Sequence, residues 1–232
     1  EREETNLIKS GRNFYGDFLN FATPNRNFEF SFPNLINSEP VLVKSKLAGR
    51  FTSGNFNVNV RVGGQNLITH NVDRVSGNYT APYASIETDF GQFNATSDNF
   101  TIEYLLQQNS AEAWVDFIEV QADRELRKAG EQTLFRSREA IGNTAQFNVG
   151  QMNSGYWVWD VSDPQNVYRQ NGQLTGNTFT FTVNVPIEKE FCAFDPGGVL
   201  LEAEMIGEVE NQNLHALSDR DMIIVTDPAF LN

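Results

Sequence analysis

Alternation of apolar and polar residues is the dominant pattern along the first 200 residues. Residues 28–32, 56–62, 100–106 and 178–185 each place Phe, Val, Ile, Tyr or Leu at every second position, with polar residues between them. This period of two is typical of a β-strand with one buried and one solvated face. Gly63 and Gly64 follow the second segment and predict a tight hairpin turn. Further turn-forming stretches lie at residues 23–27, 75–78, 94–99 and 170–172.

Strands at this spacing, with few helical stretches between them, predict an all-β fold of the antiparallel β-sandwich or jelly-roll type. Residues 121–138 are rich in charge and contain Gly130. We interpret them as strand ends around a loop, with a short helix as the alternative. Residues 156–161, which include Trp157 and Trp159, predict a strand that is buried on both faces.

A different pattern appears at residues 221–226, where DMIIVT is a continuous apolar run and not an alternation. Such runs are typical of parallel strands covered by helices on both faces. Asp227 then offers a helix N-cap, and Pro228 occupies the first helical position. We therefore expect an all-β unit over residues 1–200, with two β subdomains divided near 121–135 as an option. Residues 201–232 are expected to be a linker and the first strand of a truncated α/β domain.

The charge balance excludes one class of partner. The 232 residues hold 17 basic and 30 acidic side chains, a net charge of −13. Nucleic-acid binding requires clustered Lys and Arg, so we expect no nucleic-acid partner. Residues 188–232 contain ten acids against two bases, which supports a change of module late in the chain.

No apolar run approaches the ~18–20 residues that span a bilayer, so no membrane-spanning segment is expected. The opening residues, EREETNLIKSG, contain no hydrophobic stretch of the signal-peptide type. We expect either a protein made without such a peptide or a processed or shortened form.

Cys192 and His215 are the one pair that offers a thiol nucleophile and an imidazole base. A reactive thiolate needs a polar, electropositive setting. Cys192 instead lies between Phe191 and Ala193, which favours a buried, inert side chain. We expect His215 to pack or hydrogen-bond within a linker. The single cysteine and two histidines cannot assemble a zinc site by themselves. The sequence therefore assigns no catalytic, cofactor-binding or metal-binding residue, and no cofactor.

Two further sets of side chains have a functional and a structural interpretation. Trp114, Trp157 and Trp159 could form a sugar-stacking platform, but their strand-like context favours core packing. The carboxylates could bind calcium, which prefers oxygen ligands. Their spacing matches no known calcium loop, so we expect solvated acids; the candidates are Asp160, Asp163, Asp195 and the acidic stretch 202–210.

Four motifs, taken in order, resemble one family. GRNFYGD at residues 11–17 is similar to the start of the PorU-type sortases of the Bacteroidetes type IX secretion system, with Phe14 where that family has Trp. WDVSDP at residues 159–164 and EFCAFD at 190–195 resemble two later segments of the same family. NQNLHAL at 211–217, followed by DMIIVT at 221–226, resembles the linker and first strand of its catalytic domain.

The resemblance implies a gingipain-like cysteine peptidase whose caspase-like α/β catalytic domain uses a His–Cys dyad. The family acts at the cell surface, where it processes secreted cargo by removing sorting domains. Its dyad follows the first catalytic strand at a distance, so the catalytic residues are expected beyond residue 232. The implied partners are the downstream catalytic domain, secreted cargo proteins and other secretion-system components. The implied location is the outer membrane, cell surface or periplasm of a Gram-negative bacterium.

The sequence is therefore compatible with three functions. The first is a non-catalytic N-terminal region of a secreted cysteine peptidase or sortase, which supports the catalytic domain or docks cargo. The second is a stand-alone carbohydrate-binding β-sandwich, which would require exposed, coplanar aromatic side chains. The third is a structural cell-surface module without a ligand. Fold alone cannot choose between them.

Overall fold

The computed structural model describes residues 4–9, 13–198, 205 and 207–208, and the structural statements below concern these residues. The chain divides into two compact units, Glu1–Gly198 and Val199–Asn232. The predicted strand at residues 221–226, the N-cap Asp227, the NQNLHAL motif and His215 lie outside the described residues.

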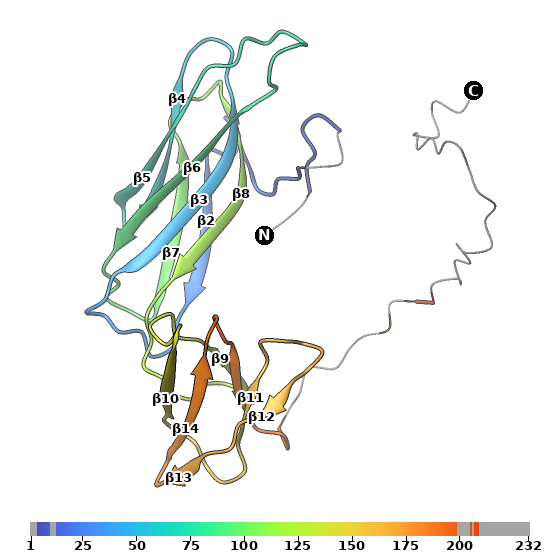
Figure 1. The fold of residues 1–232 in the computed structure, drawn as a ribbon. Coiled ribbons are helices and arrows are strands. Elements are labelled where there is room, and N and C mark those ends of the chain that lie inside the picture. Colours follow the sequence, from blue (N-terminus) through green and yellow to red (C-terminus); the bar gives the residue numbers. More distant parts are fainter. Residues whose placement is uncertain (1–3, 10–12, 199–204, 206, 209–232) are drawn as a thin grey trace, which may run out of the picture. The chain divides into compact units, whose positions relative to one another are not determined.

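Antiparallel strands make up the regular structure of the described chain (Figure 1). The strands are β1 (Phe18–Leu19), β2 (Asn25–Ser31), β3 (Val41–Arg50), β4 (Phe56–Val62), β5 (Gln65–Val72), β6 (Ser85–Phe93), β7 (Asn99–Leu106), β8 (Glu112–Gln121), β9 (Gln132–Phe135), β10 (Asn143–Val149), β11 (Trp157–Asp160), β12 (Tyr168–Arg169), β13 (Gln173–Thr175), β14 (Thr178–Val185) and β15 (Phe191–Phe194). The all-β prediction is confirmed. The helix alternative for residues 121–138 is wrong, because this stretch holds the end of β8, a loop and β9.

The first eight strands form two four-stranded sheets, with the orders β1-β8-β3-β6 and β2-β7-β4-β5. This interleaving of strands between two sheets is the order of an eight-stranded jelly roll. The predicted hairpin joins β4 to β5, and Gly63 and Gly64 both have positive φ angles (57° and 77°), which glycine adopts without steric cost. The predicted turn at residues 23–27 is displaced, because β2 already begins at Asn25 and the turn is closed by Asn20 Oδ1, which accepts from the Thr23 N–H.

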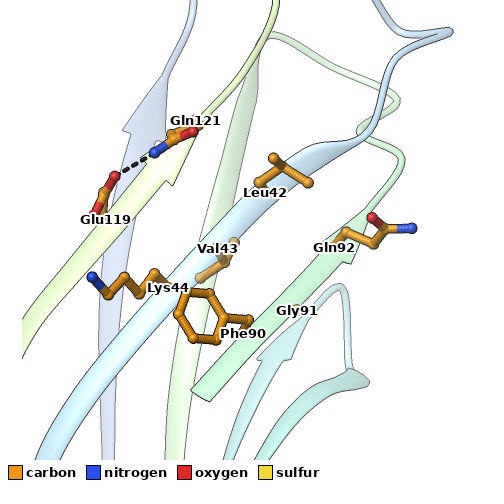
Figure 2. Close-up of a pocket in the computed structure, with 8 residues that line it drawn as sticks. All are labelled: Leu42, Val43, Lys44, Phe90, Gly91, Gln92, Glu119 and Gln121. Carbon is orange, nitrogen blue, oxygen red and sulfur yellow. Dashed lines mark hydrogen bonds between the residues drawn. The ribbon is translucent and has the colours of Figure 1, made fainter. Parts of the chain in front are cut away.

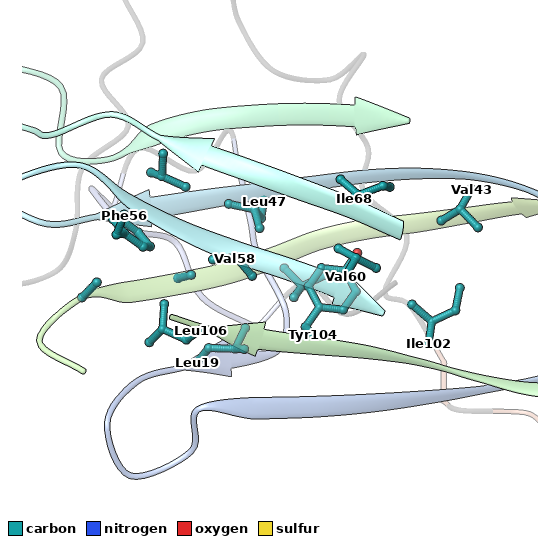
Figure 3. Close-up of a cluster of buried hydrophobic side chains, with 14 residues drawn as sticks. Leu19, Val43, Leu47, Phe56, Val58, Val60, Ile68, Ile102, Tyr104 and Leu106 are labelled. Atoms are coloured by element: carbon teal, nitrogen blue, oxygen red, sulfur yellow. The ribbon is translucent and has the colours of Figure 1, made fainter. Parts of the chain in front are cut away.

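The core of the jelly roll contains the inward side chains of both sheets (Figure 3). Val43 and Leu47 of β3 meet Val58 and Val60 of β4 and Tyr104 of β7, and all five are almost fully buried. The alternation of the sequence thus corresponds to an inner and an outer face. Removal of apolar surface from water contributes roughly 25 cal/mol for each Å², so burial of this layer stabilises the fold.

A β-bulge in β8 changes which residues face the core. β8 pairs with β3 in a continuous register except between Lys46 and Leu47, where Asp116 is the extra residue. Before the bulge Val115 packs inward, and after it Ile118 packs inward, so the inward positions change parity. Asp116 Oδ2 lies 2.8 Å from Lys46 Nζ on the neighbouring strand. The bulge therefore directs a carboxylate toward a lysine on the outer face.

The last strands form a smaller pair of sheets, with the orders β10-β14-β13 and β12-β11-β15-β9, drawn in yellow to orange in Figure 1. Four phenylalanines fill the centre of their core, and the centroids of contacting rings lie 5.1–6.0 Å apart. They are Phe135, Phe147, Phe181 and Phe191. Gly172 approaches this core closely, since a Cβ added there would lie 2.3 Å from the Thr180 carbonyl oxygen.

Truncation of a core ring tests the packing of the second sandwich. Phe181→Ala is expected to lower the free energy of unfolding by about 3–5 kcal/mol, because it removes a fully buried ring and leaves a cavity. Phe21→Ala is the matched control, since Phe21 is 71% exposed and should change stability by no more than about 0.5 kcal/mol. Urea unfolding of both variants is the measurement. Equal effects would contradict the described core.

Candidate functional site

A shallow hollow of about 520 Å³ lies on the outer face of the sheet β1-β8-β3-β6 (Figure 2). Leu42 and Lys44 of β3, Phe90 of β6 and Glu119 of β8 line it, together with their neighbours. Phe90 is 71% exposed although it stands in a regular strand. The hollow is an open depression with apolar walls and two charged groups, and it contains no pair of side chains arranged for acid–base or nucleophilic chemistry.

Lys44 and Lys46 partly cover the aromatic rings of this face. Lys44 Nζ lies 5.8 Å from the centre of the Phe90 ring and 5.4 Å from that of Phe117. Lys46 Nζ lies 5.9 Å from the Phe117 ring centre. An ammonium over a ring face is attracted by the negative face of the ring, and the lysine stems cover apolar surface.

The N-terminal segment covers the other end of the same face. Tyr15 is buried against Ala48 and Trp114, and Leu7 packs beside them. Thr5 and Tyr15 form an antiparallel bridge, which holds the segment in place. The GRNFYGD motif therefore contributes its tyrosine to packing against the sheet. Arg12 lies outside the described residues, and Asp17 lies 3.5 Å from Arg26 Nε.

Cys192 lies in β15 between Leu134 of β9 and Trp159 of β11. Its side chain is 7% exposed, so the predicted burial is confirmed. Burial raises the pKa of the Cys192 thiol, with Glu190 acting in the same direction, and this disfavours the thiolate that a nucleophile requires. The candidate base His215 lies outside the described residues.

The three tryptophans do not share one environment. Trp114 is buried as predicted. The prediction that Trp157 and Trp159 are buried, in a strand covered on both faces, is wrong. Both are half-buried, while Val158 and Asp160, on the opposite face of the strand, are buried. The two indoles lie 6.3 Å apart at an interplanar angle of 30°. Arg169 lies over Trp157 at 4.4 Å, and the edge of Phe194 packs against Trp159 at 4.9 Å.

Asp160 was expected to be a solvated acid, and this is wrong. Its side chain is 2% exposed, and its Oδ2 lies 2.6 Å from Lys189 Nζ and 2.8 Å from the Tyr168 hydroxyl. Ser162 donates to Oδ1 through both its hydroxyl and its backbone N–H. Burial opposes ionisation of Asp160, but the hydrogen bonds from Lys189, Ser162 and Tyr168 outweigh it and lower the pKa of the carboxyl. Asp163, by contrast, is exposed, and Asn166 and the Gln165 N–H hydrogen-bond to it.

A polar network that the sequence analysis did not identify lies inside the jelly roll. Ser45 Oγ lies 2.7 Å from His70 Nε2 and 2.5 Å from the Tyr104 hydroxyl. His70 Nδ1 lies 2.7 Å from Asp89 Oδ2, close enough for strong attraction although the angle is not that of a hydrogen bond. A hydrolase triad has this order of groups, but Ser45 and His70 are fully buried, so a substrate cannot reach the hydroxyl. The network is therefore structural.

Two negative observations apply to the described residues. No three of their His, Cys, Asp and Glu side chains gather closely enough to hold a metal ion. No helix with the length and apolarity needed to cross a bilayer occurs in this part of the chain.

Comparison with known proteins identifies the fold and nothing narrower. No protein-family model matches the sequence, and no curated protein matches it. Among solved structures, the chain is similar to dimeric latent PorU from Porphyromonas gingivalis, with a TM-score of 0.73 and 17% sequence identity. The similarity covers 84% of this chain and 20% of that one. The chain thus shares a fold with one fifth of PorU, in agreement with the resemblance found in the motifs.

Removal of Lys189 tests the buried ion pair. Lys189→Met is expected to lower the free energy of unfolding by about 2–4 kcal/mol. This is slightly less than the loss expected for a wholly buried ion pair, because Asp160 keeps its other hydrogen bonds. Since the pKa of Asp160 is lowered by folding, its contribution to stability is lost as the pH falls below its unfolded value of about 3.9. Without Lys189 the pKa of Asp160 in the folded protein rises toward its unfolded value, so this loss of stability in acid should become smaller.

The matched control is Arg136→Met. Arg136 Nε lies 3.6 Å from Glu188, and both side chains are about half exposed, so the expected change is within about 0.5 kcal/mol at any pH. Chemical denaturation of the three proteins at pH 7 and across the acid range measures both effects. A Lys189→Met variant as stable as the Arg136→Met control would contradict the described pair.

Proposed function

We propose that this chain is the non-catalytic N-terminal region of a secreted gingipain-like cysteine peptidase or sortase that processes cargo of the type IX secretion system. The observation that carries the proposal is the fold similarity to PorU over 84% of the chain, together with the order of the four motifs. The proposed work of the region is to support the catalytic domain or to dock cargo. Its proposed location is the outer membrane, cell surface or periplasm of a Gram-negative bacterium.

The domain boundaries belong to the same proposal. Residues 1–200 form the all-β region, and residues 201–232 are its linker and the first strand of the catalytic α/β domain. The His–Cys dyad then belongs to the polypeptide after residue 232. The burial of Cys192 and the raised pKa of its thiol support this, because they leave the one cysteine of the chain unsuited to nucleophilic attack.

The carbohydrate-binding alternative is favoured by one observation. Trp157 and Trp159 are half-buried neighbours on one sheet face, and their indoles are stacked, as a sugar-binding platform requires in part. Against it, Arg169 already occupies one face of Trp157, and the edge of Phe194 packs on Trp159. We therefore keep this function second.

The first prediction from the proposal concerns activity. The chain alone should not cleave arginyl, lysyl or sorting-domain peptides, and Cys192→Ala should leave this result unchanged. Chromatographic analysis of the peptides after incubation is the measurement. Cleavage that disappears in the Cys192→Ala variant would overturn both the proposal and the structural role of Cys192.

The second prediction separates the two leading functions. The polypeptide that follows residue 232 in the parent protein, expressed separately, should bind this chain in titration calorimetry and should contain a His and a Cys after successive strands of a parallel sheet. A glycan array should show no binding by this chain. Glycan binding that Trp159→Ala abolishes without lowering the melting temperature would replace our proposal with the carbohydrate-binding one.

A further inference from the structure

The polar network at Ser45, His70, Asp89 and Tyr104 joins the two sheets of the jelly roll. Ser45 and Asp89 are direct partners on β3 and β6 in one sheet. His70 and Tyr104 belong to β5 and β7 in the other sheet. The contact between His70 and Asp89 links β5 and β6, which are edge strands of their respective sheets. The network therefore crosses the sandwich from its interior to one open side.

We propose that this network is a proton-sensitive tie: with His70 neutral it holds β5 against β6, and protonation of His70 releases this edge of the jelly roll. The proposal does not depend on the function proposed above, because it rests on contacts within the sandwich.

The neutral state satisfies His70 Nε2 and the hydroxyl protons of Ser45 and Tyr104. Asp89 attracts the proton of His70 to Nδ1, which leaves Nε2 as an acceptor. Ser45 donates its hydroxyl proton to His70 Nε2 and accepts the hydroxyl proton of Tyr104. The hydrogen bonds thus run in one direction from Tyr104 through Ser45 to His70.

Protonation disrupts this arrangement. A charged imidazole donates from both nitrogens, so Nε2 becomes a donor to Ser45. Three protons then share the Ser45 and Tyr104 oxygens, and one hydroxyl proton has no acceptor among the contacts described for these fully buried side chains. A buried donor without an acceptor is costly, because it has lost its hydrogen bond to water.

Charge decides how strongly the tie resists protonation. Three polar groups face His70: Asp89 on β6, Ser45 on β3 and Tyr104 on β7. The other residues around it are apolar, namely Ile68 and Val72 on β5 and its partner Val58 on β4. Complete burial disfavours the imidazolium and lowers the pKa of His70, and Asp89 opposes this effect. Because Asp89 is 41% exposed, solvent screens its attraction, and burial dominates.

The sign of the pH effect follows from this balance. The unfolded chain takes up the proton at about pH 6.5, above the midpoint of the folded protein. Between these two midpoints the unfolded or opened form binds more protons, so stability falls as the pH falls. For one proton, the opening equilibrium constant rises by at most about tenfold for each pH unit.

Nuclear magnetic resonance of the histidine ring carbons tests the proposal directly. His70 should titrate below its midpoint in the unfolded chain, and a His215→Gln variant separates the two histidine signals. Asp89→Asn removes the attractive charge and should lower the His70 midpoint further. Tyr104→Phe should leave the midpoint depressed, because the Ser45 proton then lacks an acceptor when His70 is charged. A midpoint that responds to Asp89 in this way distinguishes a proton-sensitive tie from a purely structural role, and neither test depends on a variant of His70 itself.

Hydrogen exchange at pH 7 and pH 5 locates the opening. After correction for the intrinsic rates, amides of β5 and β6 should lose protection at the lower pH by at least threefold more than amides of β10 and β14. In Asp89→Asn the same loss should begin at the same pH and continue to a lower pH, because the midpoint of the folded form is lower. A His70 midpoint at or above that of the unfolded chain, a midpoint that Asp89→Asn leaves unchanged, or an equal loss of protection in all strands would each overturn the proposal.

Discussion

The two sheets of the jelly roll pack together, so that each sheet buries one face against the other sheet. The rest of this structure depends on that constraint. Inward positions of the jelly roll must be apolar or must find polar partners inside the core, because water is excluded there. Most are Val, Leu, Ile or Phe, and the exceptions Ser45, His70 and Tyr104 hydrogen-bond to one another. Outward positions need not be polar or fully covered. The N-terminal segment covers Trp114 and lysine side chains lie over Phe117, while Phe90 remains exposed.

How far the sequence predicts the fold differs between the two sheets of the jelly roll. The sheet β2-β7-β4-β5 follows the alternation pattern, so residues 28–32, 56–62 and 100–106 were correctly predicted as strands. The long strands of the other sheet were not identified. β3 places Ser45 and Gly49 at inward positions, and β6 places Asp89 inward with Phe90 exposed. The pattern fails where the fold inserts its polar network, since alternation assumes that inward residues are apolar.

The candidate sites show the same limit. The apolar neighbours of Cys192 were sufficient to predict its burial, because β15 is covered on both faces. The tryptophans of β11 were misjudged, since a strand with large residues on both faces does not reveal which face is covered. Asp160 was misjudged because its partner Lys189 is 29 residues away, and a pairing at that separation depends on the register between β11 and β15. Such contacts are tertiary, and composition and spacing do not contain them.

The extra residue at Asp116 has a consequence for comparing this protein with its relatives. Its presence shifts the inward positions of β8 by one residue. Ala113 and Val115 face the core before the bulge, and Ile118 and Val120 face it after the bulge. A relative with a straight strand at this place can be aligned correctly only with a one-residue gap inside the strand. Alignment methods ordinarily assign gaps to loops, so they would match core positions of one protein with surface positions of the other. Sequence identity computed through this strand would then understate the relationship between two proteins that have the same fold.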